Sequence, residues 1–474
     1  MSEMIPAIEI DSTSGKTDSG VRYIDTYQSE NKIYTRRIEG FYQRLRRYTG
    51  IPLLLSFLLI PWIPIDGRPA MLFDLSEQKF HIFWMTFWPQ DGILLAGLLI
   101  IAAFLLFAVT VLVGRVWCGF TCPQTVWTMM FIWAEDKCEG DRNQRIKLDR
   151  QPWSLKKLLR KGSKHTIWLV IALITGLTFI GYFYGIQQLI VDVFTFHASG
   201  ETYFWVLFFT AFTYLNAGWL REQVCKYMCP YARFQSAMYD KDTLLVTYDH
   251  ARGEQRGPRK SGTDYRADGL GDCIDCSWCV QVCPVDIDIR DGLQYACIDC
   301  GLCVDACNSV MDKMGYERGL IRFATEAAME TGQTRIFRPL MIGYFLLVLI
   351  MLGFFVYVTA TRTPVGVDVV RDRGVHLFRR VGTNIDNVYT VKINNMSRGE
   401  QTYTVSVEGA HSYKLKGQTR VLLEEGEVLT VPMRVRVPQE ALASSSEEIY
   451  FVVQSQQDPS ISARQKTRFI GPKK

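Results

Sequence analysis

The chain has 474 residues, 48% of them hydrophobic, and a formal net charge of +5. This length allows two or three domains. The small charge gives no indication of a nucleic-acid partner. The thirteen cysteines stand mostly in metal-binding spacings and do not form the pattern of a disulfide framework. Because the hydrophobic residues gather into long uncharged blocks, the sequence predicts a multidomain membrane protein.

Residues 1–47 are polar, end in a group of arginines and contain no apolar core of a signal peptide. We expect a flexible, basic segment on the cytoplasmic side. Five uncharged stretches of membrane length follow, at 48–65, 92–114, 166–191, 202–220 and 339–361. Three prolines interrupt the first stretch, so a re-entrant helix is the alternative there. The sequence thus predicts a transmembrane region of five α-helices, four within 48–220 and a fifth at 339–361.

Basic residues are distributed unevenly between the connecting loops. The loop 115–165 carries eleven Lys or Arg, whereas 192–201 carries none. Basic loops remain on the cytoplasmic side of a membrane, so we predict that 115–165 is cytoplasmic. With five spans, the N-terminus then lies inside and the C-terminal part outside. This predicts a multi-pass protein of the bacterial inner membrane, surrounded by lipid, with a periplasmic C-terminal domain.

Two matched Cys-x3-Cys pairs, each followed by proline, stand after the second and fourth predicted spans. They are Cys118 with Cys122 and Cys225 with Cys229. On a helix this spacing puts each pair on one face, and the proline tends to end or kink the helix. Four thiolates brought together at the cytoplasmic edge suit a soft metal, which is Cu(I), Zn or an iron–sulfur cluster. The alternative is a set of small buried residues at helix contacts.

Eight cysteines lie between residues 273 and 307, in two runs with C-x2-C-x2-C-x3-C spacing. This spacing is typical of bacterial two-cluster ferredoxins, in which the fourth cysteine of a run binds the other cluster. The first predicted 4Fe–4S cluster is held by Cys273, Cys276, Cys279 and Cys307. The second predicted cluster is held by Cys297, Cys300, Cys303 and Cys283. We therefore expect an inserted cytoplasmic ferredoxin domain at 221–338.

The two runs end differently. Pro284 follows the last cysteine of the first run, whereas Asn308 follows Cys307 in the second. The spacing alone therefore does not predict the final turn of the second run. A zinc ribbon is the alternative to the clusters, but it uses four ligands in two pairs and not two runs of four.

Residues 362–474 change in character. Stretches at 388–393, 402–407, 428–437 and 449–454 are rich in β-branched and aromatic residues and are separated by Gly, Asn, Asp and Ser. Some seven short strands of this kind predict an all-β, immunoglobulin-like sandwich. The region contains no cysteine, so the sandwich would lack the inter-sheet disulfide. We expect a passive stabilising or docking domain.

Longer stretches around the clusters resemble the FixG/CcoG (RdxA) family of accessory proteins in cbb-type cytochrome oxidase assembly. The stretches that carry the resemblance are 248–257, 271–276, 288–295, 310–315 and 318–322. The two Cys-x3-Cys-Pro pairs and the predicted immunoglobulin-like tail complete the pattern. The resemblance covers nearly the whole chain.

The resemblance implies a membrane protein that helps copper reach the oxidase, by reducing Cu(II) to Cu(I) or by handling the metal. In that interpretation the clusters pass electrons to copper, the substrate, and the residues that bind copper and act on it are Cys118, Cys122, Cys225 and Cys229. The protein would then be an oxidoreductase, a cupric reductase, with oxidase assembly factors as partners. A homodimer is compatible with this interpretation.

The sequence does not determine the electron donor, which is a membrane quinol or a soluble reductant. No G-x-G-x-x-G motif after a predicted strand and no P-loop is present, so nucleotide chemistry has no support. One alternative function is a quinol-oxidising electron-transfer subunit of a larger reductase. Another is a non-catalytic assembly scaffold that docks its partners through the β-domain.

Overall fold

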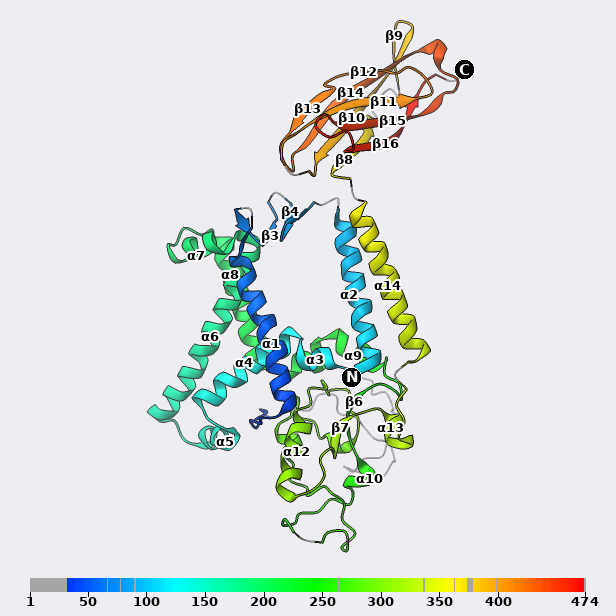
Figure 1. Cartoon of the computed structure of the whole chain (residues 1–474). Helices are drawn as coiled ribbons and strands as arrows, with labels where there is room; N and C mark the ends of the chain where they lie inside the picture. The colour runs from blue at the N-terminus through cyan, green and yellow to red at the C-terminus, as the bar shows by residue number, and fades with distance from the viewer. Residues whose placement is uncertain are drawn as a thin grey trace, which may run out of the picture. The chain divides into compact units, whose positions relative to one another are not determined.

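The computed structural model of the chain describes residues 32–472, except 66, 77, 89–90, 263, 336, 362, 373–377 and 398. Most of the predicted flexible segment 1–47 therefore lies outside the described residues. The chain divides into two compact units (Figure 1). The first comprises Met1–Met85 and Ala103–Phe345, and the second comprises Thr86–Ala102 and Leu346–Lys474.

In the part of the chain that the structure describes, three helices are long and apolar enough to cross a membrane, namely α2 (Gly92–Val113), α6 (Leu155–Tyr184) and α14 (Pro339–Ala360). They cover three of the five predicted stretches. Ile93 of α2 is 78% exposed and Leu349 of α14 is 62% exposed. Apolar helix surface that no protein covers is suited to lipid. α6 begins earlier than predicted, because Ser154 caps it by accepting a hydrogen bond from the backbone N–H of Lys157.

The other two predicted spans are helical but shorter or less apolar. α1 (Phe41–Leu59) begins with arginine-rich turns, contains Pro52 and continues into a short 3-10 turn, η1 (Ile60–Trp62). α8 (Gly200–Tyr214) continues into a π-helical turn, η3 (Leu215–Leu220). α6 and α8 pack closely at Gly176, where an added Cβ would lie 2.6 Å from Thr210 Oγ1. The count of five membrane-spanning helices stays a prediction.

Short helices and turns connect the long ones. α3 (Val116–Phe120) and α4 (Pro123–Cys138) follow α2 after a turn at Gly114, whose φ is +56°. They are followed by α5 (Arg142–Arg150) and, after α6, by α7 (Ile186–Phe194). A second π-helical turn, η4 (Val224–Met228), leads into α9 (Pro230–Ser236). π-Helical turns inside helices often mark functional sites.

Five short strands precede α2. β1 (Pro64–Ile65) pairs with β2 (Arg68–Pro69), and a small sheet joins β3 (Met71–Asp74), β4 (Lys79–Ile82) and β5 (Met85–Phe87).

The cysteine-rich region forms one small module closed by a two-stranded antiparallel sheet. β6 (Leu245–Tyr248) pairs with β7 (Ile321–Ala324), so the segments before and after the cysteines lie side by side. Between them lie α10 (His250–Gly253), α11 (Trp278–Gln281), η5 (Ile289–Asp291) and α12 (Leu302–Met314). α13 (Glu326–Thr331) follows β7. Figure 1 shows α3 and α9 next to this module.

Strands β8–β16 form two antiparallel sheets, as the sandwich prediction requires (Figure 1). One sheet has the order β12-β14-β10-β8, with β9 beside β10, and the other has the order β13-β11-β15-β16. Their bounds are β8 Val365–Arg371, β9 Arg379–Val381, β10 Asn384–Asn395, β11 Gln401–Gly409, β12 Lys414–Lys416, β13 Arg420–Leu423, β14 Val428–Pro438, β15 Ser446–Ser455 and β16 Ser462–Ile470. All four predicted strand stretches fall within β10, β11, β14 and β15. Tyr389 and Phe451, from facing sheets, are fully buried in the core with their ring centroids 5.2 Å apart.

Candidate metal centres

Two separate cavities in the ferredoxin module are lined by cysteines. One cavity is bordered by Cys273, Cys276, Cys279 and Cys307. The other is bordered by Cys283, Cys297, Cys300 and Cys303, and also by Cys279. Each group combines three cysteines of one run with the fourth cysteine of the other run, as in the two predicted ligand sets. Four soft thiols around a small cavity with otherwise mainly apolar walls fit a 4Fe–4S cluster.

Turns with positive φ place the cysteines of each run around their cavity. Asp275, Ser277 and Asp299 have φ values of 51°, 56° and 48°. Successive turns of this kind aim backbone N–H groups inward, where they can stabilise negative charge. The backbone N–H of Asp299, for example, lies 3.4 Å from Cys297 Sγ. The backbone around each cavity is therefore shaped to hold a negatively charged group that is bound through the cysteine sulfurs.

Burial disfavours the charged form of these thiols in the absence of metal. It raises the pKa of the Cys279, Cys283 and Cys307 thiols to about 12. At neutral pH each of these thiols keeps its proton until a metal displaces it, so assembly of the clusters would release protons.

The second run ends inside a helix, which explains its missing proline. α12 begins after Gly301, whose φ is +71°, and continues through Cys307 to Met314. A proline at position 308 would break this helix in its interior. Asn308 instead accepts a hydrogen bond from the backbone N–H of Gly319, at 3.0 Å. The first run ends in a turn after α11, where Pro284 is compatible with the backbone.

The paired cysteines lie at helix breaks. Cys118 is in α3, and Cys122 is the N-cap of α4, with proline in the first helical turn. Cys225 is in the π-helical turn η4, and Cys229 is the N-cap of α9. Neither pair lies on one continuous helix, because the proline starts a new helix. The expectation of an irregular helix end at each pair is confirmed.

The two pairs lie close enough to influence one another electrostatically. Burial raises the pKa of the Cys118 thiol to about 12, and the thiols of Cys122, Cys225 and Cys229 act in the same direction. The pKa of Cys225 is also raised to about 12, by burial and then by Cys122 and Cys229. The structure therefore gathers four thiols from two distant parts of the sequence.

Across the described part of the chain, no three His, Cys, Asp or Glu side chains converge on a single metal position. In a cubane each thiolate binds a different iron, so wide spacing agrees with the two cluster cavities. For the paired cysteines it means that a single metal ion would meet at most two thiols in this conformation.

Backbone contact joins α3 to the loop that carries the second set of cysteines. A Cβ added to Gly119 would lie 2.6 Å from Ile298 O and 2.9 Å from Cys300 Cα. Only glycine permits such a close approach between two backbones. Cys118, the neighbour of Gly119, is thereby held beside the Cys297–Cys303 loop, and it packs against the apolar cluster around that loop.

Buried polar groups fix this contact. Asp299 accepts hydrogen bonds from the backbone N–H groups of Arg115, at 2.9 Å, and Val246, at 3.2 Å. The Arg115 guanidinium donates to the carbonyls of Tyr295, Cys297 and Ala232, and Arg46 Nε donates to Gly119 O at 3.0 Å. Sequence reasoning missed Gly119, Arg115 and Asp299. Their only signal is position, since Gly119 lies within the first Cys-x3-Cys pair and Asp299 lies between two cluster cysteines.

Comparison with known proteins identifies the family. A family model described as a 4Fe-4S dicluster domain matches residues 220–326, and one described as a 4Fe-4S binding domain matches residues 95–136. A third, described as an IG-like fold at the C-terminal of FixG, matches residues 355–472. The nitrogen fixation protein FixG of Rhizobium meliloti is 36% identical over 485 residues, which cover 92% of each chain. The chain belongs to the FixG/Rdx family.

Two further relatives within the FixG/Rdx family come from Cereibacter sphaeroides. Protein RdxB is 39% identical over 80% of this chain and 83% of its own length, and protein RdxA is 35% identical over 81% and 84%. A crystal structure of a FixG-related protein from Vibrio parahaemolyticus is 29% identical, covers 23% of this chain and 97% of that structure, and has a TM-score of 0.22. Family membership and the two iron–sulfur matches make this chain an iron–sulfur electron-transfer protein.

Proposed function

We propose that the protein delivers electrons from its ferredoxin module to Cu(II) at the paired cysteines and releases Cu(I) for assembly of a cbb-type cytochrome oxidase. One observation carries the proposal, which is the backbone contact of Gly119 with the loop of Cys300. Because electron tunnelling weakens steeply with distance, this contact favours transfer between the second cluster site and Cys118.

In this proposal the eight cysteines around the two cavities are the cluster ligands. When bound, the clusters would act as one-electron carriers. The residues of the chain hold them and shield them from water. The Arg290 guanidinium, which is 7% exposed, lies beside the first cavity and pairs with Asp288 at 2.6 Å and with Asp275 at 2.5 Å. Arg115 and Arg46 hold α3 against the second cavity.

The paired cysteines supply the chemistry that favours reduction of copper. Thiolates are soft ligands and stabilise Cu(I) over Cu(II). Each reaction takes one electron and converts Cu(II) to Cu(I), and two thiolates are enough to bind Cu(I). Burial raises the pKa of the Cys122 thiol, and the backbone N–H groups of Thr125 and Gln124 at the start of α4 offset part of that rise. Copper binding would therefore displace the thiol proton.

The proposed location is the bacterial inner membrane, with the ferredoxin module in the cytoplasm and the β-domain in the periplasm. The basic loop 115–165 and the three apolar helices support this topology. A reducing cytoplasm also suits cysteines that must remain free to bind metal.

A second candidate function is electron transfer without copper, in which the paired cysteines hold a further 4Fe–4S cluster. The 4Fe–4S binding domain match over 95–136 favours it, because that range includes Cys118 and Cys122.

Metal content separates the two functions. Iron, copper and acid-labile sulfide would be measured in anaerobically purified protein, and Cu(II) would then be added to the dithionite-reduced sample after removal of excess dithionite. The copper proposal expects about eight irons per chain, with Cu(I) formed as the cluster spectrum becomes oxidised. About twelve irons would establish the second candidate. Eight irons without copper reduction would contradict the copper proposal.

A further inference from the structure

A cavity of about 520 Å³ lies in the first unit, next to the second cluster site. Its size is typical of a site for an organic cofactor or substrate. The apolar part of α1 contributes Ile51 and Leu54, and α4 contributes Met129 and Trp133. The ferredoxin module contributes five apolar residues near Cys283 and Cys300, which are Val282, Pro284, Val285, Ile298 and Leu302. The cavity therefore connects a helix face suited to lipid with the wall of a cluster site.

Polar atoms at this cavity lack hydrogen-bond partners. Within the described residues, Gln43 Oε1, Asp136 Oδ1 and Thr35 Oγ1 make no hydrogen bond, although the Arg145 guanidinium lies 3.3 Å from Asp136 Oδ1 as an ion pair. All three atoms are buried. Gln43 Oε1 can only accept hydrogen bonds, and Asp136 Oδ1 can only accept them while its carboxyl is ionised. A buried acceptor without a donor raises the free energy of the folded protein. A ligand that donates hydrogen bonds from an apolar body would satisfy them.

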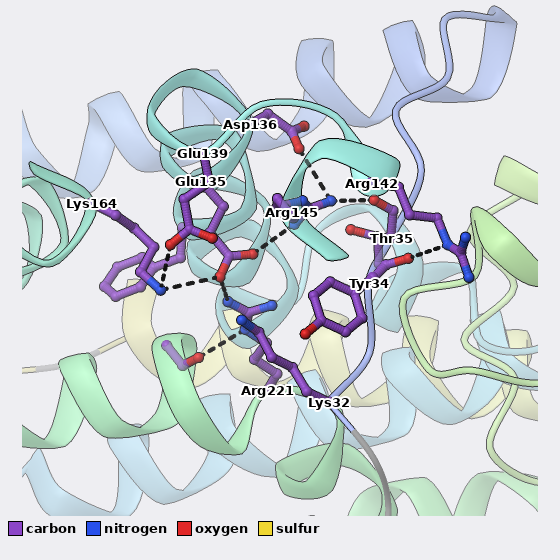
Figure 2. Close-up of polar contacts among 12 residues, drawn as sticks. Lys32, Tyr34, Thr35, Glu135, Asp136, Glu139, Arg142, Arg145, Lys164 and Arg221 are labelled. Carbon is purple, nitrogen blue, oxygen red and sulfur yellow. Dashed lines mark hydrogen bonds and ion pairs between the residues drawn. The ribbon is translucent and has the colours of Figure 1, made fainter. Parts of the chain in front are cut away.

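A buried charge network explains why Asp136 is left without a full partner (Figure 2). Glu135, on the same helix, pairs with Arg221 at 2.7 Å and with Arg145 at 2.9 Å, and Lys164 lies 3.8 Å from it. Arg145 also donates to the carbonyl of Thr35. Asp136 Oδ1 contacts the same Arg145 guanidinium at a longer distance, 3.3 Å. The cations of this network therefore pair mainly with Glu135, and Asp136 is left beside the cavity.

Asp136 can bind and release a proton near neutral pH. The pKa of this carboxyl is raised to about 6, chiefly by burial, with Glu135 and Asp141 also raising it and Arg145 and Arg37 lowering it. It lies in α4, outside the three apolar helices.

The arginines that border the cavity already have partners and the other lining cation, Lys137, is exposed to solvent, so an anionic ligand is disfavoured. Arg37 and Arg47 pair with Glu39 at 3.1 and 2.9 Å. Arg46 donates to Gly119 O, and the Arg36 guanidinium lies 3.7 Å from the ring centroid of Trp278. A phosphate headgroup would have to displace these contacts.

We propose that this cavity binds the ring of a membrane hydroquinone, with Gln43 and Asp136 accepting its hydroxyl hydrogens and the tail leaving past Ile51 and Leu54. This inference rests on the electron-transfer part of the proposed function and names the electron donor. Oxidation of one hydroquinone to quinone releases two protons and two electrons. Asp136 receives the first proton and passes it to water, the second leaves to water, and the two oxidised 4Fe–4S clusters are the acceptors of one electron each.

Binding tests the inference without relying on turnover. The full-length protein in detergent would be titrated with a short-tailed hydroquinone and photolabelled with its azido-quinone derivative. We expect saturable binding and labelled peptides within 43–54, 125–137, 282–285 or 298–302. Absence of saturable binding, or labelling confined to other segments, would overturn the inference.

Two variants and a matched control make the titration specific. Ile51→Trp places a large ring at the cavity mouth, where Ile51 is 47% exposed, and should weaken binding at least tenfold. Gln43→Leu removes one acceptor at similar size and should weaken it several-fold. Leu169→Trp adds the same ring on α6, where Leu169 is 54% exposed and outside the cavity, and should leave binding within twofold. Wild-type affinity in both cavity variants would contradict the proposed site.

A separate kinetic measurement tests the role of Asp136 as proton acceptor. Asp136→Asn should slow cluster reduction by hydroquinone in a stopped-flow experiment at least tenfold, and should remove the rise in rate that the wild type shows from pH 5 to pH 7. An unchanged pH profile would contradict the role of Asp136. Copper reduction by dithionite-reduced wild-type protein remains a separate test, so failure of the hydroquinone site and failure of the proposed function are distinguishable.

Discussion

The ferredoxin module and the paired-cysteine region use the same side chain in different settings. In the module, Cys273, Cys279 and Cys300 are buried and the other five cluster cysteines are partly exposed, and all eight border one of two small cavities. The paired cysteines are all partly exposed and lie at breaks between short helices. A cavity bordered by four cysteines suits a cofactor that stays bound, whereas thiols at the breaks between helices suit a metal that arrives and leaves.

The largest expected effect comes from Cys279, which borders both cavities. Cys279→Ser should remove more than half of the roughly eight irons, because it removes a ligand of one cluster and disturbs the wall of the other. Iron analysis and the visible spectrum measure this loss. Cys138→Ser, at the end of α4 and away from both cavities, is the control and should keep its iron. Full iron content in Cys279→Ser would disprove the ligand assignment.

One cysteine from each pair tests the other region. The double variant Cys118→Ser and Cys225→Ser should lower copper binding to about one tenth or less, because serine is a poor ligand for Cu(I). Iron should not change. Copper analysis after dialysis against a weak chelator measures the effect. Copper binding equal to that of the wild type would contradict the copper site, whereas loss of about four irons would support a further cluster.

The contact between the two regions can be weakened by one methyl group. Gly119→Ala places a Cβ against the backbone of Ile298 and Cys300, and we expect copper reduction to slow about tenfold or more because the two sites move apart. Rapid mixing of reduced protein with Cu(II) measures the rate. Gly162→Ala on α6, where an added Cβ meets nothing within 4 Å, is the matched control. Equal rates in both variants would show that the contact is not on the electron path.

The smallest expected effect concerns the end of the second run. Asn308→Ala removes the acceptor for the Gly319 backbone N–H and should lower the free energy of unfolding by about 1 kcal/mol. Asn308→Asp keeps an acceptor and should cost less. Thermal unfolding of the cluster-loaded protein compares them. If both variants are as stable as the wild type, Asn308 does not replace the missing proline in the way we describe.

Some features are local enough for the sequence to determine them. The cysteine spacings predicted two cluster sites because three ligands fall within seven residues of one another, and the backbone can wrap one cavity over such a short distance. Length and apolarity predicted α2 and α14 within one or two residues. Alternating β-branched residues predicted the core strands of the sandwich, since side chains in a strand point to opposite faces.

Other features depend on contacts between distant segments, and only the tertiary structure decided them. The prolines predicted a disturbed helix at Cys122 and Cys229, but not that each cysteine would cap a new helix. Gly119 is one of 36 glycines, and nothing nearby in sequence shows that its missing side chain admits the Cys300 loop. Asp136 and Glu135 are adjacent acids, yet the fold brings Arg221 to Glu135 and leaves Asp136 at a cavity. Spacing determines which residues are near neighbours along the backbone, whereas burial and partner choice are set by segments that meet only after folding.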